Sequence, residues 1–136
     1  MRRTAWLLEE LAAWAASQTE EQLDATPPTG GRTARSILLH VIGPHGAYLS
    51  AALTGAPGFG RVHGAAERGE LPLPAALLRT AELVSERVAA TTPEQWNAVR
   101  ELSSRSYTLR KAFRRMLEHD WEHLAELSVR PGGPSI

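Results

Sequence analysis

Residues 33–54 read TARSILLHVIGPHGAYLSAALT, and this stretch decides the fold. Drawn as a helix, it carries apolar side chains on nearly every side, which is typical of a helix inside a bundle. Thr33 suits the N-cap of this helix, and Gly55 suits its stop. Gly43-Pro44 predicts a kink, because a proline inside a helix lacks the N–H donor and its ring crowds the preceding turn.

Apolar residues recur at helical spacing in other parts of the chain. We predict three further helices, at about Arg3–Gln18, Pro74–Thr91 and Thr108–Arg130. Thr19-Glu20-Glu21-Gln22 predicts a capping box that opens one short helical turn. The segments 55–73 and 92–107 are expected to be long connections, with almost no strand signal. Four helices and no sheet indicate an all-α four-helix bundle. We expect residues 1–136 to form a single domain, with 1–2 and 131–136 frayed.

The composition excludes several functions. Fifteen basic and fifteen acidic residues give a formal net charge of zero, which argues against nucleic acid or anionic lipid as a partner. No apolar run reaches the ~18–20 residues of a membrane helix. Glu9 and Glu10 interrupt the N-terminal apolar segment, so a signal peptide is not expected and we predict a cytoplasmic protein. The chain has no cysteine, so any thiol in its chemistry comes from outside.

His119 and His123 stand four residues apart on the fourth predicted helix. This spacing places both imidazoles on one face, where two rings can share a metal ion. The alternative is a pair of exposed or core-edge histidines. The pair is not a zincin motif, because Asp120 stands where that motif has glutamate. Asp120 is expected either to accept an imidazole N–H or tie two helices, or to pair with an arginine at the edge of the core.

His40 lies on the most apolar helix, where an imidazole needs a partner. Because metal sites in bundles are built from inward groups on facing helices, His40 is the candidate third ligand. The alternative is a neutral histidine bonded to a carbonyl. Small residues follow on its face at Pro44, Ala47 and Ala51, and they predict a cleft beside the ring.

The two remaining histidines are not expected to bind metal. His45 points about 140° away from His40 on an ideal helix, so we predict that it lies at the surface or at an interface. His63 falls in the glycine-rich connection and is expected to be a solvated loop histidine, the alternative being that the loop folds over and brings it to a site.

Two stretches carry a resemblance to a known family. Residues 31–41, GRTARSILLHV, followed by Tyr48-Leu49, resemble the second helix of the DinB/YfiT-like superfamily. Residues 107–123, YTLRKAFRRMLEHDWEH, resemble its last helix. The resemblance implies a four-helix bundle of up-down-down-up order, often a homodimer. It also implies a three-histidine metal site, whose ligands here are His40, His119 and His123.

The family's known activities imply a function as well. They include metal-dependent transfer or isomerisation with low-molecular-weight thiols such as mycothiol, bacillithiol or glutathione. Three neutral imidazoles on a divalent ion, zinc or nickel, leave a coordination position open. We therefore expect a transferase that activates an external thiol against a small electrophile. The alternatives are a metal-dependent hydrolase and a non-catalytic dimeric, stress-associated bundle with a structural or vestigial metal site.

Overall fold

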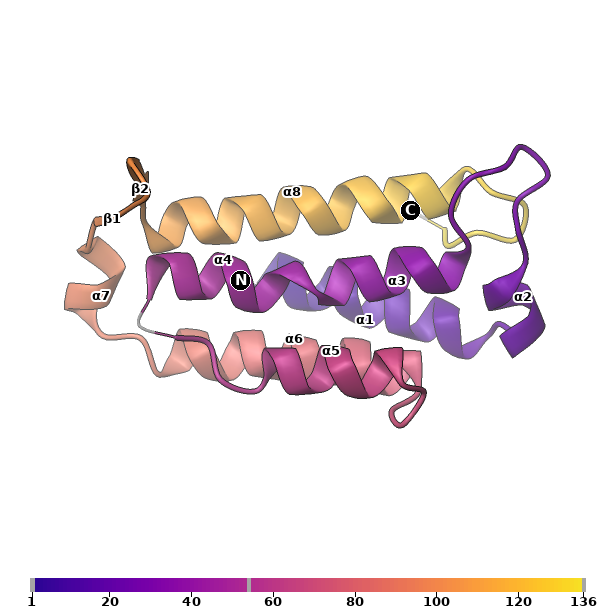
Figure 1. The fold of residues 1–136 in the computed structure, drawn as a ribbon, viewed down its shortest axis with the longest axis horizontal. Coiled ribbons are helices and arrows are strands. Elements are labelled where there is room, and N and C mark those ends of the chain that lie inside the picture. The colour runs from indigo at the N-terminus through magenta and orange to yellow at the C-terminus, as the bar shows by residue number, and fades with distance from the viewer. Residues whose placement is uncertain (1, 54, 136) are drawn as a thin grey trace.

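The computed structural model describes residues 2–53 and 55–135 (Figure 1). Its elements in chain order are α1 (Arg2–Ala16), α2 (Glu20–Asp24), α3 (Ala34–Ile42), α4 (Pro44–Ala52), α5 (Phe59–Glu67), α6 (Leu73–Ala89), α7 (Pro93–Asn97), β1 (Arg100–Leu102), β2 (Arg105–Tyr107) and α8 (Leu109–Ser128). The protein is mostly helical, as the sequence predicts. The predicted helix end at Thr54 and the terminal residues Met1 and Ile136 lie outside the described residues.

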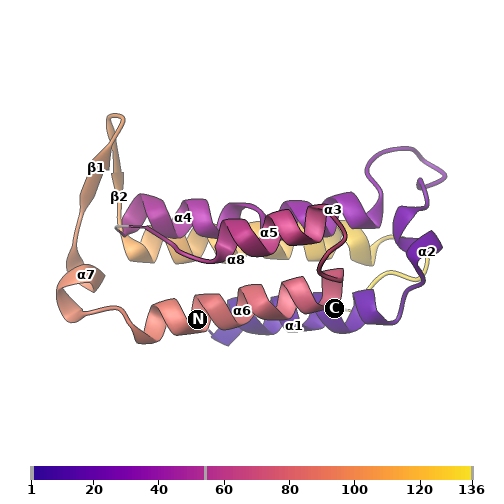
Figure 2. The same ribbon diagram turned by 60° about the horizontal axis from the view of Figure 1, so that its bottom comes forward.

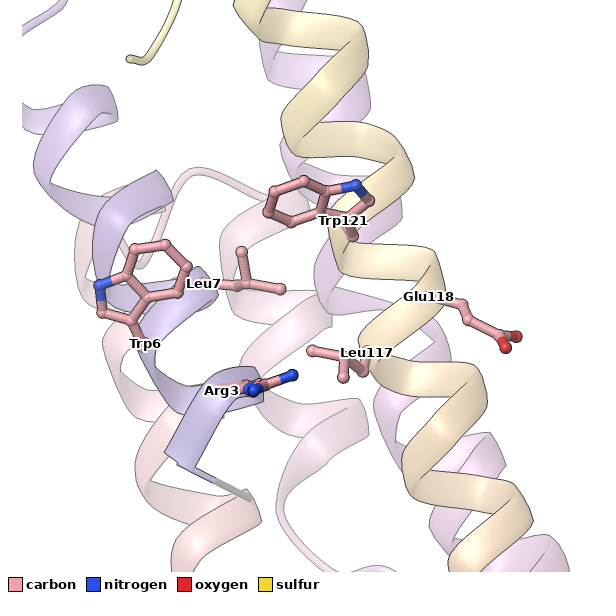
Figure 3. A pocket seen from close by; sticks show the side chains of 6 residues that line it. All are labelled: Arg3, Trp6, Leu7, Leu117, Glu118 and Trp121. Atoms are coloured by element: carbon pink, nitrogen blue, oxygen red, sulfur yellow. The ribbon is translucent and has the colours of Figure 1, made fainter. Parts of the chain in front are cut away.

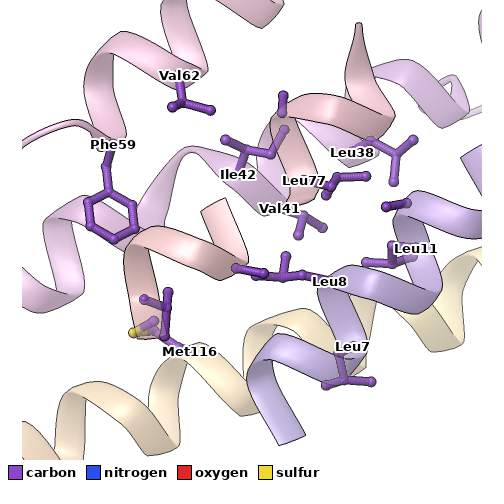
Figure 4. Packing of buried hydrophobic residues seen from close by; sticks show 14 of the residues in the cluster. Leu7, Leu8, Leu11, Leu38, Val41, Ile42, Phe59, Val62, Leu77 and Met116 are labelled. Atoms are coloured by element: carbon purple, nitrogen blue, oxygen red, sulfur yellow. The ribbon is translucent and has the colours of Figure 1, made fainter. Parts of the chain in front are cut away.

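Four long rods, α1, the α3–α4 pair, α6 and α8, run alongside one another (Figures 1 and 2). α1 packs against α6 and α8, α3 packs against the same two helices, and α4 packs against α8. The core between them consists mainly of aliphatic side chains at helical spacing (Figure 4). Fully buried members include Leu7, Leu8, Leu11, Ile37, Leu38, Leu77, Leu124 and Leu127. None of the described helices combines the length and the apolar character that crossing a bilayer requires.

The second predicted helix is interrupted at the expected place. α3 ends at Ile42, α4 begins at Pro44, and Gly43 between them keeps right-handed helical torsion angles, φ −56° and ψ −49°. The predicted N-cap of α3 is also present, because the Thr33 hydroxyl accepts a hydrogen bond from the Ser36 N–H. The predicted capping box forms at Thr19 and Gln22 and opens α2. These signals are local, which is why they can be recognised without tertiary information.

The prediction of an unstructured connection over residues 55–73 is wrong, because α5 lies within it. Its glycines, Gly60 and Gly64, lower its intrinsic helix propensity. However, Phe59, Val62 and Ala66 recur at helical spacing and are buried where α5 packs against α3 and α6. Tertiary packing therefore stabilises a helix that propensity alone does not favour.

The prediction for residues 92–107 is also wrong in part, because this segment holds α7 and a small antiparallel hairpin, β1–β2. The turn residues Ser103 and Ser104 both have positive φ, 51° and 64°. This is the backbone of a tight hairpin turn, which usually contains asparagine or glycine, so the sequence carries no such signal. Arg100 attaches the hairpin to the end of α4 by donating to the carbonyls of Ser50 and Leu53.

Candidate metal site

The structure brings together the three histidines that the sequence singles out. His40 comes from α3, and His119 and His123 come from α8. Their ring centroids are 5.0 Å (His40–His119), 4.9 Å (His40–His123) and 4.6 Å (His119–His123) apart. One nitrogen from each ring lies within 4.8 Å of the others. Ligands of a tetrahedral ion with bonds of ~2.1 Å lie about 3.4 Å apart, so a modest contraction completes such a site.

The His119 ring presents a free nitrogen to this cluster. Its Nδ1 lies 3.4 Å from Oδ1 of Asp120, a contact that favours the tautomer with the proton on Nδ1. Its Nε2 is buried and has no hydrogen-bond partner among the described residues. A buried polar atom without a partner costs free energy in a folded protein, unless it serves a ligand. The orphaned Nε2 fits a metal-bound imidazole.

Glu126 orients the ring of His123. Its Oε2 lies 3.0 Å from Nδ1 of His123 and accepts the ring proton, which leaves Nε2 unprotonated and able to ligate a metal ion. Arg32 donates to the same carboxylate at 2.7 Å. Burial raises the pKa of Glu126, but the hydrogen bond from His123 and the charge of Arg32 outweigh it, so this pKa lies below its ordinary value. Glu126 is therefore an anion that can support a ring bound to a cation.

His40 lies at the open edge of the cluster and is the most exposed of the three residues. Contact with neighbouring atoms desolvates its ring, and this is the main reason why its pKa is lowered. The charges of His119, His123 and Arg32 lower the pKa further. The ring is therefore neutral at neutral pH, as a metal ligand must be.

A cavity of about 390 Å³ opens beside His40, and Thr33, Ser36, His63 and Glu67 are among the residues that line it. Pro44, Ala47 and Ala51, along which the sequence predicts a cleft, do not line this cavity, so that cleft stays a prediction. Helical side chains lean toward the N-terminus of their helix, so the His40 ring covers the turn that contains Ser36 instead. The open space beside the ring consequently lies toward the start of α3.

His45 differs most from its prediction of a surface or interface position. It is 0% exposed, its Nδ1 lies 2.9 Å from the carbonyl oxygen of Val41, and its Nε2 lies 3.1 Å from Oδ2 of Asp120. His45 follows the buried Val41 by four residues and precedes the buried Leu49 by four, so it lies on the buried face of the rod, whereas His40 lies at the exposed edge. Asp120 contacts His119 and ties α8 to α4, as one of the two predictions states, and the alternative pairing with arginine is wrong.

His63 is not a loop residue, contrary to prediction. It belongs to α5, its Nδ1 lies 3.5 Å from Oε2 of Glu67, and it lines the cavity beside His40. Sequence reasoning missed the roles of Arg32 and Glu126. The position of Glu126, three residues after His123, is the signal that could have revealed the carboxylate, because this spacing puts both side chains on one helix face.

A second hollow lies on the opposite side of α8, between α8 and α1 (Figure 3). This groove has a volume of about 650 Å³ and is lined by Arg3, Trp6, Leu7, Leu117, Glu118 and Trp121. Trp6 and Trp121 are each 47% exposed.

A comparison with known protein families shows to which family the chain belongs. The family model of the DinB superfamily matches residues 3–127. The chain belongs to the DinB superfamily. No curated protein and no solved structure matches it. The family match covers all three clustered histidines of this DinB-superfamily chain, together with the elements that carry them.

Proposed function

We propose that the protein binds a divalent metal ion, zinc or nickel, at His40, His119 and His123. The buried, unpartnered Nε2 of His119, on a ring that is clustered with two further imidazoles, is the observation that carries this proposal. The donor set consists of nitrogen atoms alone, which suits both ions. Three protein ligands are the number found in catalytic zinc sites, whereas structural sites use four.

The residues around the cluster prepare it for such an ion. Asp120 and Glu126 hold the Nδ1 protons of His119 and His123, so that each ring presents Nε2. His40 stands between the cluster and the cavity, which is large enough for a small substrate. When bound, the ion supplies Lewis acidity and an open coordination position, which favour the deprotonated form of a thiol or of water.

We propose further that the reaction transfers an external low-molecular-weight thiol, such as mycothiol, bacillithiol or glutathione, to a small electrophile. The absence of cysteine supports this assignment, because the chain has no sulfhydryl of its own. In the net reaction the thiol exchanges its S–H bond for an S–C bond. The proton leaves with the displaced group or ends on the adjacent carbon of a conjugated acceptor. The cytoplasm, where such thiols are kept reduced, is the proposed compartment.

The test combines metal analysis with an activity assay. Protein purified without chelators or added metal is expected to hold about one zinc or nickel ion per chain. It is also expected to accelerate conjugation of monobromobimane with at least one of the three thiols. His123→Ala is expected to lose both metal and conjugation. His63→Gln, a histidine change outside the cluster, is the control and is expected to keep the metal.

Each other outcome has a definite meaning. Conjugation unaffected by His123→Ala would overturn the mechanism. Metal that raises the melting temperature without conjugation would overturn the transferase assignment and favour the non-catalytic bundle, because a ligand bound only by the native state stabilises it. Metal-dependent ester hydrolysis without thiol transfer would favour the hydrolase. Protein that takes up neither ion would overturn the metal site itself.

We also propose that the four long rods form the up-down-down-up bundle of the family and that two copies associate through the groove between α1 and α8. Exposed tryptophans support this, since they are enriched at the centres of protein interfaces. The groove carries both Arg3 and Glu118. In an isologous dimer, which is built from the same patch twice, a second copy can therefore offer each charge its opposite.

A further inference from the structure

Behind His119 lies a buried polar chain that the proposed reaction does not use directly. It runs from the carbonyl of Val41 on α3, through His45 on α4, to Asp120 on α8, and from Asp120 to His119. His45 and Asp120 are both 0% exposed. Their mutual contact joins residues 75 positions apart in the sequence.

The directions of these hydrogen bonds follow from what each group can donate. The Val41 carbonyl only accepts, so Nδ1 of His45 carries a proton and donates it over 2.9 Å. A second proton must lie between Nε2 of His45 and Oδ2 of Asp120, because two lone pairs would otherwise face each other across 3.1 Å. The pair therefore consists either of a protonated histidine and a carboxylate or of a neutral histidine and a carboxylic acid. In both forms it carries no net charge. A neutral pair is the arrangement that burial tolerates best.

The second oxygen of Asp120 is fixed by this arrangement. With Oδ2 held by His45, Oδ1 is directed at Nδ1 of His119 and can accept its proton. This contact keeps Nε2 of His119 in its unprotonated form and aims it at the other two imidazoles. Without His45, the carboxylate would be buried with a single partner and free to turn away from His119.

We propose that His45 is a positioning residue for the metal site and acts through Asp120 on the tautomer and the orientation of His119. This inference rests on the proposed metal binding. It assigns His45 a role distinct from that of the three ligands, because its two ring nitrogens are already engaged by Val41 and Asp120. In many metal sites a carboxylate accepts a proton from a histidine that binds the metal. Here Asp120 is that carboxylate for His119, and His45 in turn holds Asp120 in place.

The first test measures the affinity of the folded protein for Zn²⁺ alone, by competition with a chromogenic chelator. His45→Phe keeps a planar aromatic ring at this position and removes both hydrogen bonds. It is expected to weaken Zn²⁺ binding about 10–100-fold, the usual effect of losing an outer partner. Asp120→Ala is expected to weaken binding at least as much. His45→Phe in the Asp120→Ala background is expected to add no further loss, because His45 acts only through Asp120.

A matched control separates this role from general stability. Leu77→Ala removes a fully buried side chain on α6, a helix that carries none of the three clustered histidines. It is expected to lower the melting temperature while leaving the Zn²⁺ affinity of the folded protein unchanged. A folded His45→Phe protein with wild-type Zn²⁺ affinity would overturn the inference.

A second measurement needs no variant and so remains informative if His45→Phe does not fold. In metal-free protein labelled with ¹⁵N-histidine, NMR is expected to show His119 protonated at Nδ1 alone. Finding its proton on Nε2 would overturn the inference. A wild-type protein that does not bind Zn²⁺ would instead contradict the proposed function. Failure of the inference and failure of the proposed function can therefore be told apart.

Discussion

Arg35 on α3 shows how a single residue fixes the short helix α2. Its Nε donates to Oδ1 of Asp24 at 2.6 Å, and its guanidinium also contacts Glu20. The hydrogen bond from Arg35 is the main cause that holds the pKa of Asp24 below its ordinary value. The carboxylate form is therefore favoured by folding, and α2 is attached to α3 by an ion pair at the surface.

Asp24→Asn is expected to lower the melting temperature slightly at neutral pH, because an exposed ion pair contributes little to stability. A carboxyl whose pKa is lower in the folded state stabilises the protein above its unfolded pKa. This contribution is lost as the pH falls through the folded value. The melting temperatures of wild type and Asp24→Asn, measured from pH 7 down to pH 2, are thus expected to converge below about pH 4. A gap that stays constant over this range would contradict the assignment.

At the same scale, the three clustered histidines could be predicted from the sequence. The residues that hold their rings in place, His45, Arg32 and Glu126, could not. His119 and His123 are recognisable because a spacing of four fixes their relative direction on any regular helix. His40 follows from its position on the most apolar helix. The prediction for His45 fails because it takes His40 to face inward, whereas His40 lies at the exposed edge of the rod and the side that carries His45 is buried.

At the scale of the helix, α4 and α5 meet at a glycine. A Cβ atom at Gly46 would lie 2.8 Å from Cβ of Phe59, so only glycine lets α5 approach this closely. Gly60 in α5 has open space where its side chain would be. The two positions form a matched pair, because both are helical glycines and only one is in close contact.

Gly46→Ala is expected to destabilise the protein by ~1–3 kcal/mol, since overpacking outweighs the helix propensity gained from alanine. Gly60→Ala is expected to be neutral or to stabilise the protein by up to ~1 kcal/mol. Urea denaturation of both variants measures these changes. Equal effects of the two substitutions would show that α4 and α5 do not pack as described.

The helices that the sequence predicts correctly are those whose apolar stripes are long enough to identify them alone. α5 has nine residues, two of them internal glycines, and its three buried side chains gain their significance from α3 and α6. The strands β1 and β2 have three residues each. In elements this short, too few apolar residues repeat for a helix or strand periodicity to be recognised. The contacts that stabilise these elements also come from residues distant in sequence.

At the scale of the whole molecule, the groove between α1 and α8 leads to a prediction about assembly. The wild type is expected to sediment as a dimer, because burying Trp6 and Trp121 removes their exposed apolar surface from water. Trp6→Glu and Trp121→Glu are each expected to shift the protein to monomer. Leu78→Glu is the control, because Leu78 is 45% exposed on α6, outside the groove, and is expected to leave the dimer intact. A monomeric wild type in sedimentation velocity would refute this mode of association.

The three imidazoles come from α3 and α8, whereas α1 and α6 contribute none of them. Substitutions in α1 and α6 can therefore change the thermal stability of the protein without altering the three histidines. In directed evolution, a library confined to α1 and α6 would explore robustness, and one confined to α5 and the start of α3 would explore substrate range. The architecture keeps these two kinds of adaptation on separate stretches of the gene.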